Sequence, residues 1–84
     1  MYEVMLESHA ERDLRKLPSQ DFSRVIAALQ TLANNPRAVG CRKIVGSHND
    51  WRIRVGDYRV LYEISDHERT VRIMRVKHRK EAYR

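Results

Sequence analysis

The sequence predicts an α+β fold in which two antiparallel helices pack on one face of a small, mainly antiparallel four-stranded sheet. The elements follow the order β-α-α-β-β-β. Residues 8–17 and 19–33 repeat apolar residues at helical spacing, whereas residues 51–62 alternate apolar and polar residues as strands do. The apolar helix faces need a cover, and the apolar face of the sheet is the candidate. A chain of 84 residues is expected to form one domain, 1–84.

The first strand is predicted at residues 2–6, and the first helix follows it. Ser8 and Glu11 match the capping box that starts a helix by satisfying free backbone N–H groups. Ala10, Leu14 and Leu17 then recur on one helical face, and Pro18 ends the helix.

The second helix is predicted to begin near Ser19 and to stop at residues 34–36, Asn-Asn-Pro, because the residue before proline resists helical geometry. Its apolar positions follow a period of 3.6 residues, which indicates a buried face. These positions are Phe22, Val25, Ile26, Leu29, Leu32 and Ala33.

Residues 51–62 predict a β-hairpin with a two-residue loop at Gly56-Asp57. Glycine at the first loop position is typical of a type II′ turn, and this loop length fixes the register of the two strands. Arg54 then lies opposite Arg59, with Arg52 on the same face. Like charges placed opposite each other destabilise a sheet, so three arginines there favour an anion-binding role.

The last strand is predicted at residues 70–77, after a brief extended segment at 41–45. Val71 and Ile73 share one parity, but Met74 and Val76 have the other. The pattern indicates either a bulge or a central strand that is covered on both faces. We favour the second, because a strand that pairs with both the hairpin and residues 2–6 is central.

The net charge of +6 is concentrated in the second half of the chain. Residues 1–50 carry seven Lys/Arg and six Asp/Glu, whereas residues 51–84 carry ten and five. A basic surface of this kind favours a polyanionic partner, most often nucleic acid. The sequence has no apolar run that predicts a membrane span, and its single cysteine indicates the cytoplasm. No element carries metal-ligand spacing, so neither a metal nor another cofactor is predicted.

The last seven residues, HRKEAYR, follow the final strand directly and are expected to lie beside the arginine face. They supply His78, which titrates near neutral pH, the fixed cation Arg79, and the phenol of Tyr83. Together with the hairpin arginines, they predict a surface that handles phosphate.

Four segments resemble the RelE/ParE superfamily of bacterial and archaeal toxins. They are LRKLP at 14–18, NNPR at 34–37, WRIRVGDYRVLYEI at 51–64 and HRKEAY at 78–83. The resemblance implies a RelE-like fold and a cognate antitoxin that wraps and neutralises the toxin. Resemblance to the RelE branch further implies a metal-independent endoribonuclease, an mRNA interferase, that cleaves mRNA in the ribosomal A site and inhibits translation.

The same resemblance implies which residues form the site. The family's functional positions fall at Arg52, Arg54, Arg59, His78, Arg79 and Tyr83. The best-known RelE pattern has lysines at the first two positions, and arginine cannot serve as a base because it does not lose its proton. The arginines are therefore expected to stabilise the charge of the transition state, and His78, or else Tyr83, to transfer protons.

Two other functions fit the sequence. A ParE-like member of the superfamily would inhibit DNA gyrase without catalysis, although such a protein has no evident use for an arginine-rich face. The chain could also be a catalytically weakened basic module that binds RNA or the ribosome, because its arginines replace the family's lysines.

Overall fold

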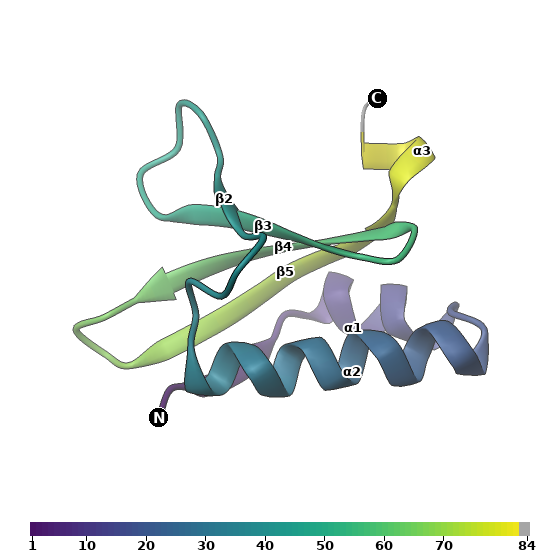
Figure 1. The fold of residues 1–84 in the computed structure, drawn as a ribbon, viewed down its shortest axis with the longest axis horizontal. Coiled ribbons are helices and arrows are strands. Elements are labelled where there is room, and N and C mark those ends of the chain that lie inside the picture. Colours follow the sequence, from purple (N-terminus) through teal and green to yellow (C-terminus); the bar gives the residue numbers. More distant parts are fainter. Residues whose placement is uncertain (83–84) are drawn as a thin grey trace.

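The computed structural model describes residues 1–82 and confirms the predicted α+β class (Figure 1). In chain order the elements are β1 (Glu3–Leu6), α1 (Ser8–Arg15), α2 (Ser19–Asn34), β2 (Arg42–Lys43), β3 (Asp50–Val55), β4 (Tyr58–Ser65), β5 (Thr70–His78) and α3 (Arg79–Ala82). The five strands form one sheet in the order β1-β5-β4-β3-β2. The sheet has one strand more than predicted, because residues 42–43 pair with β3.

The strands are antiparallel except for the outer pair β1 and β5, which run parallel. Helices α1 and α2 lie together on one face of the sheet, while the loops around β2 and the short α3 rise from the other face (Figure 1). Within residues 1–82, no helix is long and apolar enough to cross a membrane.

The predicted apolar helix faces supply one layer of the core. Ala10 and Leu14 of α1 are buried, as are Val25, Leu29 and Leu32 of α2. The sheet supplies the other layer, as predicted: Ile53, Val60, Tyr62, Ile64, Val71, Ile73 and Val76.

Two details of the helices differ from prediction. Ser8 is the first helical residue of α1 and makes no capping bond, and Glu11 instead pairs with Arg15 one turn later. Phe22 is 42% exposed, because it lies in the first turn of α2 and outside the packed apolar face.

The hairpin has the register that the two-residue loop predicted. Arg54 pairs with Arg59, and Val55 with Tyr58. Gly56 has φ +58°, the positive value that the first loop position of a type II′ turn requires. A Cβ at this position would lie 3.3 Å from the Arg24 guanidinium of α2, a flexible group that can move aside, so the conformation of the turn is what favours glycine.

The preferred explanation for the parity change in the last strand is wrong in part. Strand β5 is central, as predicted, but the change comes from a bulge. Tyr62 pairs with Ile73 and Leu61 with Arg75, so Met74 is an extra residue without a partner on β4. A single extra residue reverses the faces of all side chains beyond it. For this reason Ile73 and Val76 are both buried on the helix side.

Helix α1 is fixed to β5 through Asp13, beyond the point where β1 ends. The carboxylate accepts bonds from Arg75 Nε at 2.8 Å and from the Val76 N–H at 2.9 Å. Burial alone would raise the pKa of Asp13, but the bonds from Arg75 and Val76 lower it below its ordinary value. Asp13 therefore satisfies an N–H on the part of β5 that β1 does not cover.

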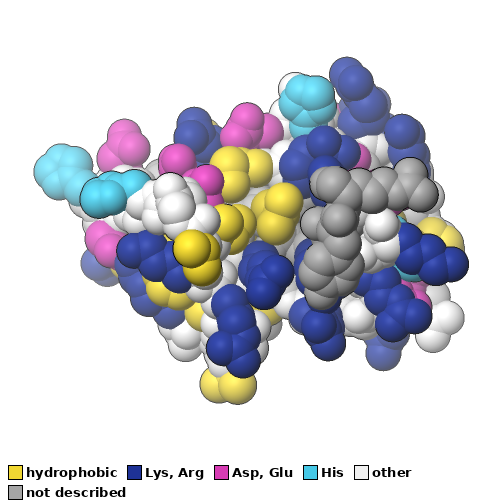
Figure 2. Space-filling model, turned by 90° about the horizontal axis from the view of Figure 1, so that it is seen from above, with side chains coloured by type: hydrophobic (Ala, Val, Ile, Leu, Met, Phe, Trp, Pro, Cys, Tyr) yellow, Lys and Arg dark blue, Asp and Glu magenta, His cyan; other side chains and the backbone are white. Residues whose placement is uncertain are grey.

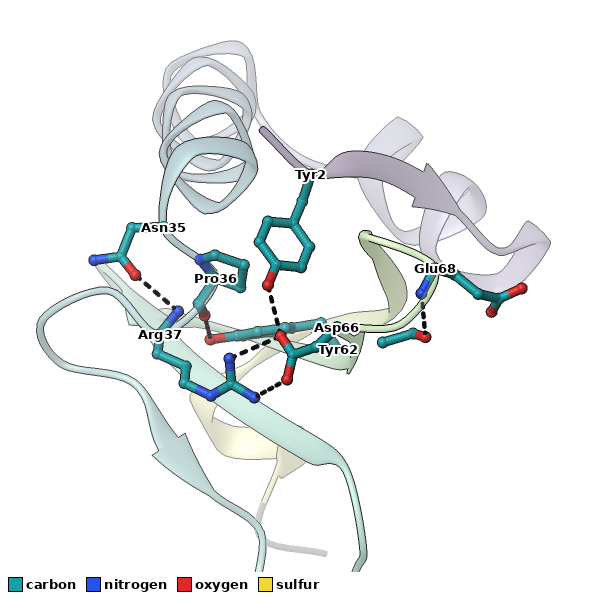
Figure 3. Close-up of polar contacts among 8 residues, drawn as sticks. Tyr2, Asn35, Pro36, Arg37, Tyr62, Asp66 and Glu68 are labelled. Carbon is teal, nitrogen blue, oxygen red and sulfur yellow. Dashed lines mark hydrogen bonds and ion pairs between the residues drawn. The ribbon is translucent and has the colours of Figure 1, made fainter.

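A second polar cluster joins three distant segments around Asp66 in the turn between β4 and β5 (Figure 3). Asp66 accepts a 2.6 Å bond from the Tyr2 hydroxyl, and Arg37 binds both carboxylate oxygens at 3.1 and 2.9 Å. The Arg37 guanidinium also lies 5.4 Å from the centroid of the Trp51 ring. Nearby, the buried Tyr62 hydroxyl donates to the Pro36 carbonyl at 2.8 Å. The cluster anchors the loop at 35–41 to the sheet.

Replacing Asp66 by Asn tests this anchor. Bonds from Arg37 and Tyr2 lower the pKa of Asp66 to about 2. The carboxyl of an unfolded chain has a pKa of about 3.9, so the stabilisation is complete above that value and is lost as the pH falls through the folded value. We expect Asp66→Asn to lower the free energy of unfolding at neutral pH, with a difference that shrinks below pH 4. Urea unfolding at several pH values measures this, and a pH-independent difference would contradict it.

Candidate anion-binding site

The face of the sheet opposite the helices carries a cluster of arginines from three strands. Alternation along β3 directs Arg52 and Arg54 to this face, away from the buried Ile53 between them. The strand register places Arg59 of β4 directly opposite Arg54, and Arg42 of β2 directly opposite Arg52. Figure 2 looks down on this face and shows Lys and Arg side chains gathered across it. Strands β2, β3 and β4 therefore hold two arginine–arginine cross-strand pairs side by side.

These arginines line two adjoining hollows, which we call together the arginine basin. The larger has a volume of about 310 Å³ and is lined by Gly40, Arg42, Arg52, Arg54 and Arg59. The smaller has a volume of about 190 Å³ and is lined by Arg54, Gly56, Arg59 and Arg79. Arg54 and Arg59 belong to both. Within residues 1–82, no carboxylate lines the basin. The basin is therefore strongly positive.

The basin arginines differ in how firmly they are held. Arg59 is only 5% exposed, whereas Arg52, Arg54 and Arg79 are exposed to solvent. Arg79 begins α3 directly after β5, and its N–H donates a 2.7 Å bond to the Asp57 carbonyl in the hairpin turn. This backbone bond places the start of α3 beside the Gly56-Asp57 loop and thus brings Arg79 to the basin.

The structure does not bring His78 to the arginines. His78 pairs with Tyr58 across the strands, and their rings meet edge to face with centroids 5.3 Å apart. His78 Nδ1 also accepts a bond from the Lys80 N–H at 3.2 Å. The reason is the bulge at Met74: it turns His78 toward the helix side and Lys77 toward the arginine face.

His78 instead lines a separate hollow of about 320 Å³, with residues of α1, β4, β5 and α3 around it. Its neighbour Tyr58 has a raised pKa, first because of burial and then because of the Asp21 carboxylate of α2. Proximity to α2 confirms that this ring pair lies on the helix side of the sheet. Tyr83, the last of the predicted site residues, lies outside the described residues.

Reasoning from the sequence missed Arg42 and Gly40 as basin residues. Their segment was predicted only as a brief extension, because two paired residues leave too little alternation to define a strand. Arg42 lies ten positions before its partner Arg52, and only the register of β2 on β3 connects them. Lys77 was also missed: it lies opposite Arg59 on β5, and its face depends on the bulge.

The chemistry of the basin follows from its side chains. Guanidinium groups bind phosphate oxygens through two parallel N–H donors and keep their charge at any physiological pH. Residues 1–82 contain no group of three or more His, Cys, Asp or Glu side chains placed to hold a metal ion. The fold and the basin therefore define a small basic domain whose open sheet face suits a phosphate-bearing polyanion.

Comparison with known proteins places this domain in a family. The chain belongs to the RelE/ParE superfamily of toxins: residues 4–83 match the family model described as the ParE toxin of the type II toxin–antitoxin system parDE. It is 39% identical to Toxin RelG of Mycobacterium tuberculosis, over 99% of this chain and 97% of that protein.

Solved structures of RelE-type toxins share the fold. The RelBE2 toxin–antitoxin complex of M. tuberculosis matches with a TM-score of 0.82 at 33% identity, covering 92% of this chain and 96% of that one. The RelE–RelB complex of Pyrococcus horikoshii matches with a TM-score of 0.83 at 25% identity, covering 93% and 94%. Within the superfamily this chain is therefore a RelE-like toxin of a type II system.

The pairing of Arg54 with Arg59 is expected to lower the stability of the folded protein while it favours the binding of an anion. Replacing Arg54 with Gln removes the repulsion from Arg59 and leaves the buried Arg59 in place. We expect Arg54→Gln to raise the free energy of unfolding by about 0.2–1 kcal/mol, with a smaller gain at high ionic strength, where salt screens the repulsion. Urea unfolding at two salt concentrations measures both effects. Arg12→Gln on α1 is the control, because Arg12 is exposed and lines neither hollow, and an equal gain in that variant would contradict the prediction.

Proposed function

We propose that this toxin is a ribosome-dependent endoribonuclease that cleaves mRNA in the ribosomal A site and so inhibits translation. The observation that carries the proposal is the Arg54–Arg59 pair, which lines both hollows of the basin. Because such a pair destabilises a sheet, its presence at the centre of a concave surface favours a role in binding phosphate. The relatives with RelE names support this reading of the basin.

In the proposed reaction the ribose 2′-hydroxyl attacks the adjacent phosphorus. The new P–O2′ bond forms as the P–O5′ bond breaks, and the products are a 2′,3′-cyclic phosphate and a free 5′-hydroxyl. A base takes the proton from the 2′-hydroxyl, and an acid supplies one to the departing oxygen. The pentacoordinate transition state carries extra negative charge on its equatorial oxygens. Arg54, Arg59 and Arg79 converge where they would stabilise that charge.

The proton-transfer groups of the proposal must lie on the arginine face. His78 is directed to the other side of the sheet and is not proposed for this role. Lys77 lies directly opposite Arg59 on that face and, unlike arginine, it can give up its proton. We therefore propose Lys77 as the base in place of the lysines of the best-known RelE pattern. Tyr83, outside the described residues, keeps the proton-transfer role expected from the sequence, and we propose that it supplies the proton to the departing oxygen.

The partner proposed for the toxin is a cognate antitoxin protein. The solved relatives include the complexes of RelE with RelB from P. horikoshii and Methanococcus jannaschii. An acidic antitoxin segment would be attracted to the open basic face, and the attraction would speed its association at low salt.

A second candidate function is inhibition of DNA gyrase, which is the activity of ParE-like members of the superfamily. The description of the matching family model as a ParE toxin favours it. The two functions separate experimentally, because only the ribonuclease requires the arginine basin for its chemistry.

Loss of one basin arginine tests the ribonuclease. Arg59→Ala and Arg79→Ala should each lower the cleavage rate about 100-fold or more, because each removes a charge that stabilises the transition state. Translation of a defined mRNA on purified ribosomes, followed by primer extension, measures cleavage at each codon. Arg15→Ala on α1 is the charge-matched control.

Should the basin variants keep full toxicity in cells, the ribonuclease proposal fails, and supercoiling by purified gyrase becomes the assay. Absence of A-site cleavage by the wild-type toxin would overturn the proposal equally.

Exchange of Lys77 for Arg tests the proposed base. Arg keeps the positive charge but cannot accept a proton, so Lys77→Arg should lose activity about as severely as Lys77→Ala, roughly 10²–10⁴-fold. The rise of the rate with pH should also disappear, because a base must be deprotonated to act. Single-turnover cleavage at several pH values gives both readouts. A Lys77→Arg variant with the wild-type rate and pH profile would exclude the role.

A further inference from the structure

The two hollows of the arginine basin meet at Arg54 and Arg59 but end on different residues. The smaller hollow ends at Gly56 and Arg79, beside the hairpin turn. The larger extends in the other direction, to Arg52 and Arg42. The basin is therefore longer than a single phosphate group requires, and its far end is built by β2.

The short strand β2 fixes which of its two basic side chains reaches the basin. Arg42 pairs with Arg52 and shares its face, whereas Lys43 pairs with Trp51, whose ring packs against the core on the helix side. Backbone bonds from Ile44 N–H to the Asp50 carbonyl at 2.9 Å and from Cys41 N–H to the Ala38 carbonyl at 3.0 Å hold the strand at both ends. The position of Arg42 is thus set by the backbone.

Arg42 and Arg52 combine two features. Four arginines outside the basin, Arg15, Arg37, Arg72 and Arg75, each form an ion pair with a carboxylate. Within residues 1–82, neither Arg42 nor Arg52 forms an ion pair, although both are exposed and lie directly opposite each other. A second unfavourable like-charged pair, next to the first and without a carboxylate to relieve it, indicates a second anionic group in the ligand.

The spacing of the two pairs fits consecutive phosphates. Arg52 and Arg54 are two residues apart on β3, a rise of roughly 7 Å along the strand. This length is comparable to the distance between neighbouring phosphates in an extended nucleotide strand. We infer that the arginine basin holds two consecutive phosphates of a single RNA strand, with Arg42 and Arg52 on the phosphate next to the one being cleaved. This inference rests on the proposed function for the identity of the cleaved phosphate.

The two positions have different roles. Arg42 lines only the larger hollow, whereas Arg54, Arg59 and Arg79 line the smaller one, where the proposal places the reacting phosphorus. Arg42 is therefore a substrate-binding residue: it lengthens the footprint of the toxin on RNA and orients the strand across the basin. Its loss should weaken binding and leave the chemical step unchanged.

Short uncleavable oligonucleotides count the phosphate positions directly. The ligands are a 2′-deoxy dinucleotide with one phosphate and a 2′-deoxy trinucleotide with two, each titrated into the isolated toxin. Arg42→Ala should weaken trinucleotide binding about tenfold, the effect of losing one charge-assisted contact, and should leave dinucleotide binding unchanged. The slope of log K against log salt for the trinucleotide should also become shallower by about 0.7.

Lys43→Ala is the matched control, because it removes the same charge from the same two-residue strand on the opposite face. It should alter the binding of both ligands slightly and equally. The inference is overturned if Arg42→Ala weakens both ligands equally or acts no more strongly than Lys43→Ala. It is also overturned if the wild-type toxin binds the trinucleotide no better than the dinucleotide.

Kinetics on the ribosome separate this inference from the proposed function. Arg42→Ala should raise KM about tenfold without changing kcat, whereas Arg59→Ala lowers kcat. A fall in kcat for Arg42→Ala would overturn the binding role. If the wild-type toxin cleaves no mRNA, the proposed function fails, but the oligonucleotide titrations still decide whether the basin has two phosphate positions.

Discussion

The two-residue turn at Gly56-Asp57 is the constraint on which the functional face depends. A loop of this length leaves one register for β3 and β4, and that register sets Arg54 against Arg59. The same turn accepts the backbone N–H of Arg79 and so draws the end of the chain to the basin. Gly56 is favoured at the first loop position because its φ is positive. One tight turn thus assembles cations from two strands and a terminal helix.

Arginines in this protein have two kinds of surroundings. Outside the basin, two arginines bind carboxylates and so join segments far apart in sequence: Arg75 binds Asp13, and Arg37 binds Asp66. In the basin, arginines lie directly opposite other arginines on neighbouring strands. The first group stabilises the fold, whereas the like-charged pairs of the second group repel each other across the strands. The apolar core on the opposite face of the sheet must offset this repulsion, which the proposed phosphate ligand would relieve.

The sequence was sufficient for most of the fold. Helical spacing located both helices, and alternation with a diagnostic turn located the hairpin, because these signals are local and strong. It was sufficient for the basin centre as well, since Arg52, Arg54 and Arg59 follow from the hairpin register alone. The features that the sequence did not predict depend on pairing between strands. The pairing of Arg42 with Arg52 depends on a two-residue strand, and the orientation of His78 depends on one extra residue at Met74. When apolar residues switch from odd to even positions along a strand, the sequence does not distinguish a bulge from a strand that is buried on both faces.

The pairing of β1 with β5 has a consequence for when the toxin folds during its synthesis. The first strand of the chain is hydrogen-bonded to the last, with Glu3 beside Thr70 and Leu6 beside Ile73. Such contacts, almost as distant in sequence as the chain permits, form late, because the longest loop must close before they stabilise anything. During synthesis β1 has no partner until the final strand has been made. The sheet that displays the arginines is therefore complete only after β5 has left the ribosome.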